Sequence, residues 1–360
     1  MKIPFNDLKR INNDFKNQFI SSFEDHLVSQ NFINGEAIRK FELNFSDKLD
    51  SNFLACSNGT DAITAALHCL DIQYGDEVIL PAMSWFSTSE VISLLGAKPI
   101  FVDVDEYYTI DESKIEEKIT DKTKAIIIVH LYGQTCNIYE IIKIAKKYNL
   151  KLIEDCAQSH FSKFDNKFVG NFGHIGTFSF YPGKNLGSLG DAGGICSKDQ
   201  KIYLKLKRFI NHGSLKKHEH SIIGTNSRLD SIHGSFLNLK LPFIDKWNNE
   251  RVEIAKYYND NLKNEKIISL PKIRKNTFHT FHVYCIRIHE RNSFINYMSK
   301  NGIQVSIHYP VALPFLKPYN IQPSFFPSAY EYQNQIVSLP IFPKMNANEM
   351  EYVVDVINRY

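Results

Sequence analysis

Short apolar runs alternate with amphipathic helical segments between residues 77 and 154, and this alternation restricts the possible folds of the chain most. The run at residues 125–129 (AIIIV) contains no polar side chain, so both of its faces are predicted to be buried. The predicted strands cover residues 77–80, 99–104, 125–129 and 151–154, and the helices between them cover residues 84–95 and 137–148. Such alternation is typical of an α/β fold whose parallel sheet is covered on both faces. Ligands of these folds bind beyond the carboxyl ends of the strands.

The chain beyond residue 199 has a different pattern and predicts a second, smaller unit. The expected elements are a helix at 199–211, a polar loop at 212–224, a helical connector at 231–263 interrupted at Pro242, strands at 278–288 and 303–308, and a closing helix at 347–358. Residues 1–50 are expected to form helices at the rim. We therefore predict a large domain over residues 1–245 and a smaller C-terminal α+β domain over residues 246–360.

The charge balance and the cysteines exclude several classes of protein. The 42 Lys and Arg residues against 39 Asp and Glu give a net charge of +3, which does not favour binding to nucleic acid or to a membrane surface. No apolar run reaches the ~20 residues that span a bilayer, and the start MKIPFND predicts no signal peptide. Six scattered cysteines without a Cys-x-x-Cys pair indicate free thiols in a cytoplasmic protein and argue against a zinc site.

A glycine-rich stretch at residues 176–197 places one lysine, Lys184, on a loop between two predicted buried strands, 177–181 and 193–197. Glycine permits the tight turns that such a loop needs. Lys184 is either a solvated cation or a functional amine. The buried strands on both sides, and an acid at the end of another strand, favour the functional amine.

Polar residues follow the ends of several predicted strands. Trp85, Asp155 and Gln158 all lie just past strand ends, where a ligand is expected. Residues 57–61 (SNGTD) open a helix whose first amides and dipole favour an anion such as phosphate. Simpler interpretations also exist: Trp85 as a core aromatic, and Asp155 and residues 57–61 as helix caps. No Gly-x-Gly-x-x-Gly follows a strand, so a dinucleotide-binding fold is not indicated.

Residues 179–187 (SFYPGKNLG) resemble the lysine loop of the DegT/StrS family of nucleotide-sugar aminotransferases. The resemblance extends over nearly the whole chain, from residues 3–8 (IPFNDL) to residues 338–343 (SLPIFP), and includes PAMSWFST at 81–88 and GTNSRLD at 224–230. It implies the fold type I of pyridoxal phosphate enzymes, which is aspartate aminotransferase-like, with a mostly parallel seven-stranded sheet in the large domain.

The resemblance also implies pyridoxal 5'-phosphate as cofactor and a role for each motif residue. Lys184 would bind the cofactor covalently and move a proton, Asp155 would pair with the ring nitrogen, Gln158 would bond the ring oxygen and Trp85 would stack on the ring. Gly59, Thr60 and Ser179 would hold the phosphate. Asn226 from a second subunit would complete this phosphate site, which implies a homodimer with shared sites.

The expected partners are a nucleotide sugar and glutamate, again by resemblance. Tyr181, Arg228, His308 and Tyr309 are the candidate substrate-binding residues. Arg228 would meet a carboxylate, or else form a structural ion pair with Asp230 or Glu250. Lys216 and Lys217 would meet a diphosphate, although a solvated loop is the simpler reading.

Residues 130–134 (HLYGQ) resemble the corresponding stretch of enzymes that aminate 3-keto sugars. Tyr132 and Gln134 in this stretch could form hydrogen bonds with sugar oxygens. We expect a thymidine diphosphate 3-keto-6-deoxyhexose as acceptor, giving an amino sugar for a surface polysaccharide such as the O-antigen of lipopolysaccharide. The alternatives are amination at carbon 4, a uridine diphosphate 3-keto sugar acid as acceptor, or a non-catalytic regulator on the same scaffold.

Overall fold

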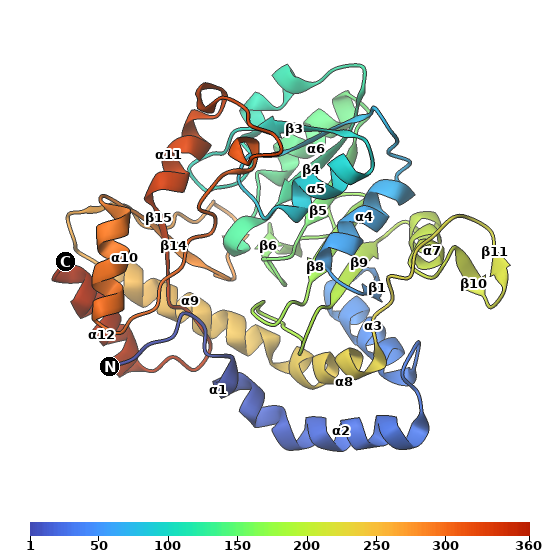
Figure 1. Cartoon of the computed structure of the whole chain (residues 1–360), viewed down its shortest axis with the longest axis horizontal. Coiled ribbons are helices and arrows are strands. Elements are labelled where there is room, and N and C mark those ends of the chain that lie inside the picture. The colour runs from blue at the N-terminus through green and yellow to red at the C-terminus, as the bar shows by residue number, and fades with distance from the viewer.

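A seven-stranded sheet forms the centre of the computed structural model, which describes all 360 residues (Figure 1). Its order is β1-β9-β8-β5-β4-β2-β3, and every strand is parallel to its neighbours except β9, which runs antiparallel to β1 and β8. The strands are β1 (Asn52–Cys56), β2 (Glu77–Pro81), β3 (Lys98–Val102), β4 (Thr123–Val129), β5 (Lys151–Asp155), β8 (Ile175–Ser179) and β9 (Gly193–Ser197). The expected mostly parallel α/β fold is therefore confirmed.

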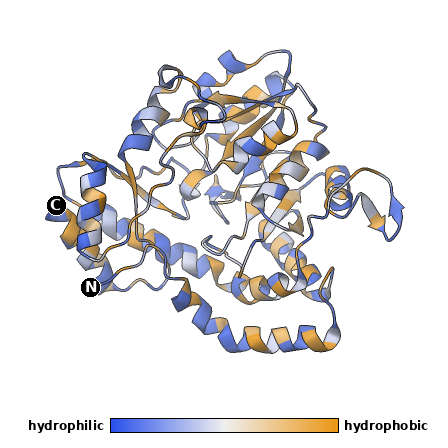
Figure 2. Ribbon diagram, in the orientation of Figure 1, coloured by the Kyte–Doolittle hydropathy of each residue, from blue (hydrophilic) through white to orange (hydrophobic).

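Helices cover both faces of this sheet because its strands are apolar on both sides. In β4, Ile127 packs into one hydrophobic cluster, and its neighbours Ile126 and Ile128 pack into another on the opposite face. The first cluster contains α4 (Gly59–Cys69), α5 (Ser87–Leu94) and α7 (Gln200–Phe209); the second contains α3 (Glu36–Leu49), α6 (Ile138–Lys147) and α8 (Ser231–Lys240). Alternate side chains of a strand point to opposite faces, so one apolar run supplies both cores. Figure 2 shows these strands as largely hydrophobic.

The C-terminal part builds a smaller sheet with its own core. The strands β12 (Ile267–Ser269), β14 (Tyr284–Ile288) and β15 (Ile336–Leu339) pack with the helices α9 (Ile244–Asn261), α10 (Arg291–Lys300) and α12 (Ala347–Asn358). Residues before and within α11 (Pro327–Gln335), such as Leu313 and Ala329, instead join the core of the large sheet. The predicted domain boundary at residue 245 falls in the first turn of α9 and stays a prediction.

Several predicted elements occur nearly where the sequence placed them. The closing helix matches α12, and the connector consists of α8, a short 3-10 turn (Leu241–Phe243) at Pro242, and α9. The polar loop contains a small hairpin of β10 (Ser214–Lys216) and β11 (Glu219–His220), which projects from the body (Figure 1). The remaining strands are β6 (Lys163–Phe164), β7 (Lys167–Phe168) and β13 (Thr277–Phe278).

Three predictions about secondary structure were wrong in part. The strand expected at residues 278–288 is divided between β13 and β14, which belong to different sheets. Residues 303–308 form no strand but only two isolated bridges, Ile303 with Ile3 and Ser306 with Ser338, because the segment crosses between the N-terminus and the small sheet. The N-terminal helical stripe is divided into α1 (Leu8–Asn12), a 3-10 turn (Asn13–Phe15) and α2 (Lys16–Ser29).

The helix α2 lies along the edge of the molecule (Figure 1), and hydrophobic positions recur along it (Figure 2). Ile20, Phe23, Leu27 and Val28 are all exposed. The opposite face of the N-terminal helices packs on the body: Ile11 and Phe15 are buried, and the ring of Phe19 contacts that of Phe236 in α8. Among the helices, none combines the length and the apolar character that crossing a bilayer requires.

Candidate active site

One cavity of about 660 Å³ lies at the carboxyl ends of the parallel strands, within the size range typical of small-molecule sites. Most of the residues singled out from the sequence line it: Gly59, Thr60, Trp85, Asp155, Gln158, Ser179, Tyr181, Lys184, His308 and Tyr309. They come from segments spread over most of the chain. The topology of the sheet brings them together because parallel strands end at the same edge.

The loop that carries Lys184 is fixed from several sides. Its ends are closed by backbone hydrogen bonds from Lys184 to Tyr181 (2.9 Å) and from Ser188 to Phe180 (2.7 Å). The side chain of Asn185 donates to Asn248 (2.9 Å) in the neighbouring connector. Burial lowers the pKa of the Lys184 amine to about 8, against the opposing charge of Asp155. A lysine with this pKa is partly neutral near physiological pH, as a nucleophilic amine must be.

Asp155 is the last residue of β5 and is buried at the floor of the cavity. Its Oδ1 accepts a hydrogen bond from the backbone N–H of Ala157 (3.0 Å), and its Oδ2 accepts from the hydroxyl of Thr88 (3.4 Å). Burial raises the pKa of this carboxyl, while the Ala157 amide and the nearby charge of Lys184 oppose the shift. A cationic group placed beside Asp155 would keep it ionised.

The N-terminus of α4 forms a second wall. The side chain of Asn58 caps the helix by accepting from the N–H of Asp61 (2.8 Å), and the N–H of Ala62 makes the first intrahelical bond, to the carbonyl of Asn58. The amides of Gly59 and Thr60 come before that bond and remain available to an anion. A Cβ on Gly59 would lie 2.8 Å from Ser179 Cβ, so only glycine lets β8 approach this helix end.

The opposite wall is aromatic. The amide of Gln158 donates to the hydroxyl of Tyr309 (2.8 Å), and its oxygen accepts from the backbone N–H of Tyr132 (2.8 Å). The rings of Trp85 and Tyr309 are tilted, with centroids 5.5 Å apart. Burial and the charge of Lys184 lower the pKa of His308 to about 4, so this imidazole is neutral. Trp85 and Tyr181 are exposed at the mouth, where a planar ligand could stack.

Asn226 and Arg228 do not line the cavity of their own chain. Asn226 is exposed and forms a bridge with Asn211. Arg228 donates to the side chain of Asn211 (3.0 Å) and makes neither of the ion pairs considered for it, with Asp230 or Glu250. Lys216 is also exposed, and it pairs with Glu219.

The expected contact of Tyr132 and Gln134 with a sugar was wrong. Both side chains are buried and lie outside the cavity. The hydroxyl of Tyr132 donates to the carbonyl of His308, and the amide of Gln134 donates to the carbonyl of Lys272 (2.7 Å). These polar groups are satisfied by backbone partners, so they position the loops around the cavity rather than contact a ligand.

Some cavity residues were not found by sequence reasoning. Phe5 and Asn6 line the cavity from the N-terminal segment; the ring of Phe5 stacks on His308 (5.4 Å), and Asn6 donates to the carbonyl of Gly183 (3.2 Å). Ser84 and Thr88 also face it. Phe5 and Asn6 lie in the stretch at residues 3–8 that carries part of the resemblance, but no role was inferred for them, and only the tertiary structure places them at the cavity.

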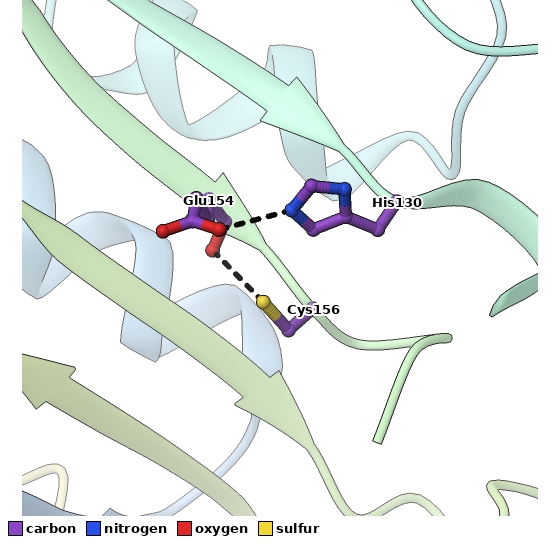
Figure 3. A group of neighbouring side chains, drawn as sticks. All are labelled: His130, Glu154 and Cys156. Atoms are coloured by element: carbon purple, nitrogen blue, oxygen red, sulfur yellow. Dashed lines mark hydrogen bonds and ion pairs between the residues drawn. The ribbon is translucent and has the colours of Figure 1, made fainter. Parts of the chain in front are cut away.

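A buried cluster of His130, Glu154 and Cys156 lies at the carboxyl ends of β4 and β5 (Figure 3). Glu154 accepts from His130 Nε2 (3.1 Å) and from three backbone amides, of Gly170, Phe172 and Gly173. Burial raises its pKa, but these donors outweigh burial and leave the pKa below the ordinary value.

This donor set does not suit a metal ion. His130 Nδ1 already accepts from the N–H of Cys136 (3.2 Å), so neither ring nitrogen has a free lone pair. Burial raises the pKa of the Cys156 thiol, which therefore stays protonated and is a poor ligand. The cluster instead fixes the loop at residues 170–173 to the end of β5.

The cavity fits pyridoxal phosphate on the evidence of its own groups. It offers an amine of lowered pKa, a buried carboxylate, and free amides at a helix N-terminus for a phosphate. The space between them is flanked by exposed aromatic rings. Bound there, the cofactor supplies a carbonyl that captures amines and a ring that withdraws electrons.

Comparison with known proteins identifies the family. Residues 13–358 match the DegT/DnrJ/EryC1/StrS aminotransferase family. The chain is 42% identical to the dTDP-3-amino-3,6-dideoxy-alpha-D-galactopyranose transaminase of Aneurinibacillus thermoaerophilus, over 99% of both sequences. Its fold matches the crystal structure of S. venezuelae DesV in complex with a ketimine intermediate, with a TM-score of 0.96 at 30% identity, covering 99% of this chain and 98% of that one.

A further solved structure concerns the cofactor. The chain matches NtdA from Bacillus subtilis with bound cofactor PMP at a TM-score of 0.90 and 29% identity, covering 99% of this chain and 85% of that one. The chain thus belongs to the DegT/DnrJ/EryC1/StrS aminotransferase family and is a pyridoxal phosphate-dependent nucleotide-sugar aminotransferase.

Proposed function

We propose that the protein transfers the amino group of glutamate to carbon 3 of a thymidine diphosphate 3-keto-6-deoxyhexose. The observation that carries this proposal is the full-length similarity to a transaminase named for a dTDP-3-amino-3,6-dideoxygalactose. The HLYGQ motif supports the same carbon by resemblance. Tyr132 and Gln134 contact backbone groups and not the cavity, so this support rests on the resemblance alone.

We assign the chemistry to two groups that face one cavity from the ends of neighbouring strands. Lys184 binds the cofactor and, when released, its neutral amine moves the proton at the reacting carbon. Asp155 holds the ring nitrogen protonated by its negative charge. The opposite charges of Asp155 and Lys184 influence each other's pKa across the cavity, and that coupling supports the pairing of their roles.

The remaining roles follow from the walls of the cavity. Gly59, Thr60 and Ser179 receive the phosphate at the α4 N-terminus, Gln158 bonds the ring oxygen, and Trp85 stacks on the ring. We assign the sugar to Tyr181, His308 and Tyr309, which line the same cavity. Because Gln158 already donates to Tyr309, a bound ring oxygen would share or replace that hydrogen bond.

Two assigned residues need a second subunit. Asn226 and Arg228 lie outside the cavity of their own chain, and we propose that they enter the site of a homodimer partner, Asn226 at the phosphate and Arg228 at a substrate carboxylate. We place the enzyme in the cytoplasm, where its six unpaired cysteines stay reduced. Its amino sugar would be incorporated into a surface glycan such as the O-antigen.

The test supplies glutamate and pyridoxal phosphate with each of three acceptors: a thymidine diphosphate 3-keto-6-deoxyhexose, its 4-keto isomer, and a uridine diphosphate 3-keto sugar acid. NMR then locates the new amine. We expect turnover of the first at carbon 3, and loss of turnover by several powers of ten in Lys184→Ala, since both cofactor attachment and proton transfer are lost. An amine only at carbon 4, or turnover of the sugar acid alone, would reject the proposed acceptor.

A further inference from the structure

Two buried hydroxyls connect the Asp155 carboxylate to the cavity. Thr88 lies in the first turn of α5, is fully buried, and places its Oγ1 3.4 Å from Asp155 Oδ2. Ser84 Oγ lies 2.7 Å from the same Thr88 Oγ1. Both residues face the cavity and lie in the stretch at 81–88 (PAMSWFST), in which the resemblance implied a role only for Trp85.

The protons of this chain can be placed by counting donors. A hydroxyl donates one proton, and an ionised carboxylate can only accept. While Asp155 is ionised, Thr88 must therefore donate to Asp155, and Ser84 must donate to Thr88. If Asp155 were protonated, the order could reverse, with Thr88 donating to Ser84. The direction of the two hydroxyl bonds is thus coupled to the charge of Asp155.

The Asp155 carboxylate makes few other hydrogen bonds. Its Oδ1 is held by the amide of Ala157, which leaves Thr88 as the hydroxyl that reaches Oδ2. A buried charge without its hydrogen bonds is costly. The first turn of α5 also brings the positive end of a helix dipole beside Oδ2. Removing the Thr88 hydroxyl would free the carboxyl to rotate and would favour its neutral form.

We propose that Thr88, backed by Ser84, is a positioning residue that keeps Asp155 ionised and aimed at the ring nitrogen of the cofactor. The inference rests on the proposed pairing of Asp155 with that nitrogen. It predicts that removal of the Thr88 hydroxyl weakens binding only of a ligand that contains the ring nitrogen. A residue that only supports the fold would affect every ligand of the cavity equally.

The experiment measures equilibrium binding of two ligands to the full-length protein: pyridoxal phosphate, and its deaza analogue with carbon in place of the ring nitrogen. All variants carry Lys184→Ala, so that neither ligand bonds covalently to that residue. We expect Thr88→Val, which keeps the shape but lacks the hydroxyl, to weaken pyridoxal phosphate roughly tenfold, the loss typical of one hydrogen bond to a charged group. The affinity for the deaza analogue should not change. Thr88→Ser should restore the stronger binding of pyridoxal phosphate relative to the deaza analogue.

Two further variants keep every outcome informative. Ser84→Ala should cause a smaller loss with the same preference, and it replaces the valine variant if that protein does not fold. Equal loss of both ligands, or no loss, overturns the inference. Asp155→Asn should abolish the preference for pyridoxal phosphate. If Asp155→Asn keeps the preference, the proposed role of Asp155 fails; if it loses the preference while Thr88→Val keeps it, only the role of Thr88 fails.

Discussion

Lys240 is an unusual residue because it is buried without a carboxylate partner. Its side chain is 3% exposed, and its Nζ donates to the carbonyl of Gly187 in the lysine loop (2.5 Å) and lies 4.9 Å from the ring centre of Phe236. Burial lowers its pKa to about 8. The ammonium therefore holds the loop at a cost in stability, since hydrogen bonds and a ring replace its hydration only in part.

This cost should appear as a pH-dependent stability. Between pH 8 and the ordinary lysine pKa of about 10.4, the unfolded chain keeps a proton that folded Lys240 has lost, so stability rises with pH there. Relative to Lys240→Met, the wild-type free energy of unfolding should rise by at most about 3 kcal/mol across this window. Urea titrations at pH 7.5 and pH 10 measure the difference. If wild type and Lys240→Met differ in free energy of unfolding by the same amount at both pH values, the pKa of Lys240 is not lowered in the folded protein.

At the scale of elements, the loop between β8 and β9 is held more tightly than its glycine content suggests. Its backbone contacts α8 through Lys240, and the hydroxyl of Ser188 lies 2.9 Å from His233 Nδ1 on the same helix. A Cβ on Gly187 would lie 2.2 Å from the carbonyl oxygen of Pro182. At Gly183 the nearest atom would be 3.8 Å away, in the ring of Tyr181. Glycine is required at the first position and not at the second.

The two glycines provide a matched pair of variants. Gly187→Ala should lower the free energy of unfolding by about 1–3 kcal/mol, because the loop must shift to relieve the overlap. It should also weaken pyridoxal phosphate binding, since Lys184 moves with the loop. Gly183→Ala should stay within about 0.5 kcal/mol of the wild type. Urea unfolding and ligand titration measure both effects, and similar losses in the two variants would contradict this account of the loop.

At the scale of the whole molecule, the proposed homodimer explains two features of the surface. The apolar side chains of α2 are exposed, and so is Asn226, although the sequence resemblance places that residue at the cofactor phosphate. A symmetric dimer would bury an apolar face and exchange residues between the two sites. Lys184 and Asp155, by contrast, line one cavity of one chain.

Mixing inactive variants tests this division. After subunit exchange between Lys184→Ala and Asn226→Ala, about half of the dimers are mixed, and one site of each mixed dimer has both residues intact, so about a quarter of wild-type activity should return. The matched control mixes Lys184→Ala with Asp155→Asn. Each site takes both Lys184 and Asp155 from one chain, so every site of a mixed dimer lacks one of the two residues and no activity returns. Activity in the control, or none in the first mixture after verified exchange, would contradict the shared site.

Features that depend on local sequence pattern could be predicted before the structure was known. Helical spacing predicts α12 and the connector with its turn at Pro242, and apolar runs predict β2, β4 and β5. These signals are local because burial of a face repeats along one segment. The lysine loop and the polar residues at strand ends predict the cavity in the same way, since parallel strands bring their carboxyl ends to one edge.

Features that depend on contacts between segments far apart in the chain could not be predicted from local pattern. The pairing of β1 with β9, which was not predicted, joins residues more than a hundred positions apart, and residues 303–308 form no strand because the N-terminus crosses beside them. Tyr132 and Gln134 look like ligands in the sequence, yet backbone carbonyls from distant loops satisfy them. Thr88 lies in the stretch at 81–88 that resembles the family, but its contact with Asp155 emerges only from the fold. A polar side chain acts on whichever partner folding brings within hydrogen-bond distance, and sequence spacing does not contain that information.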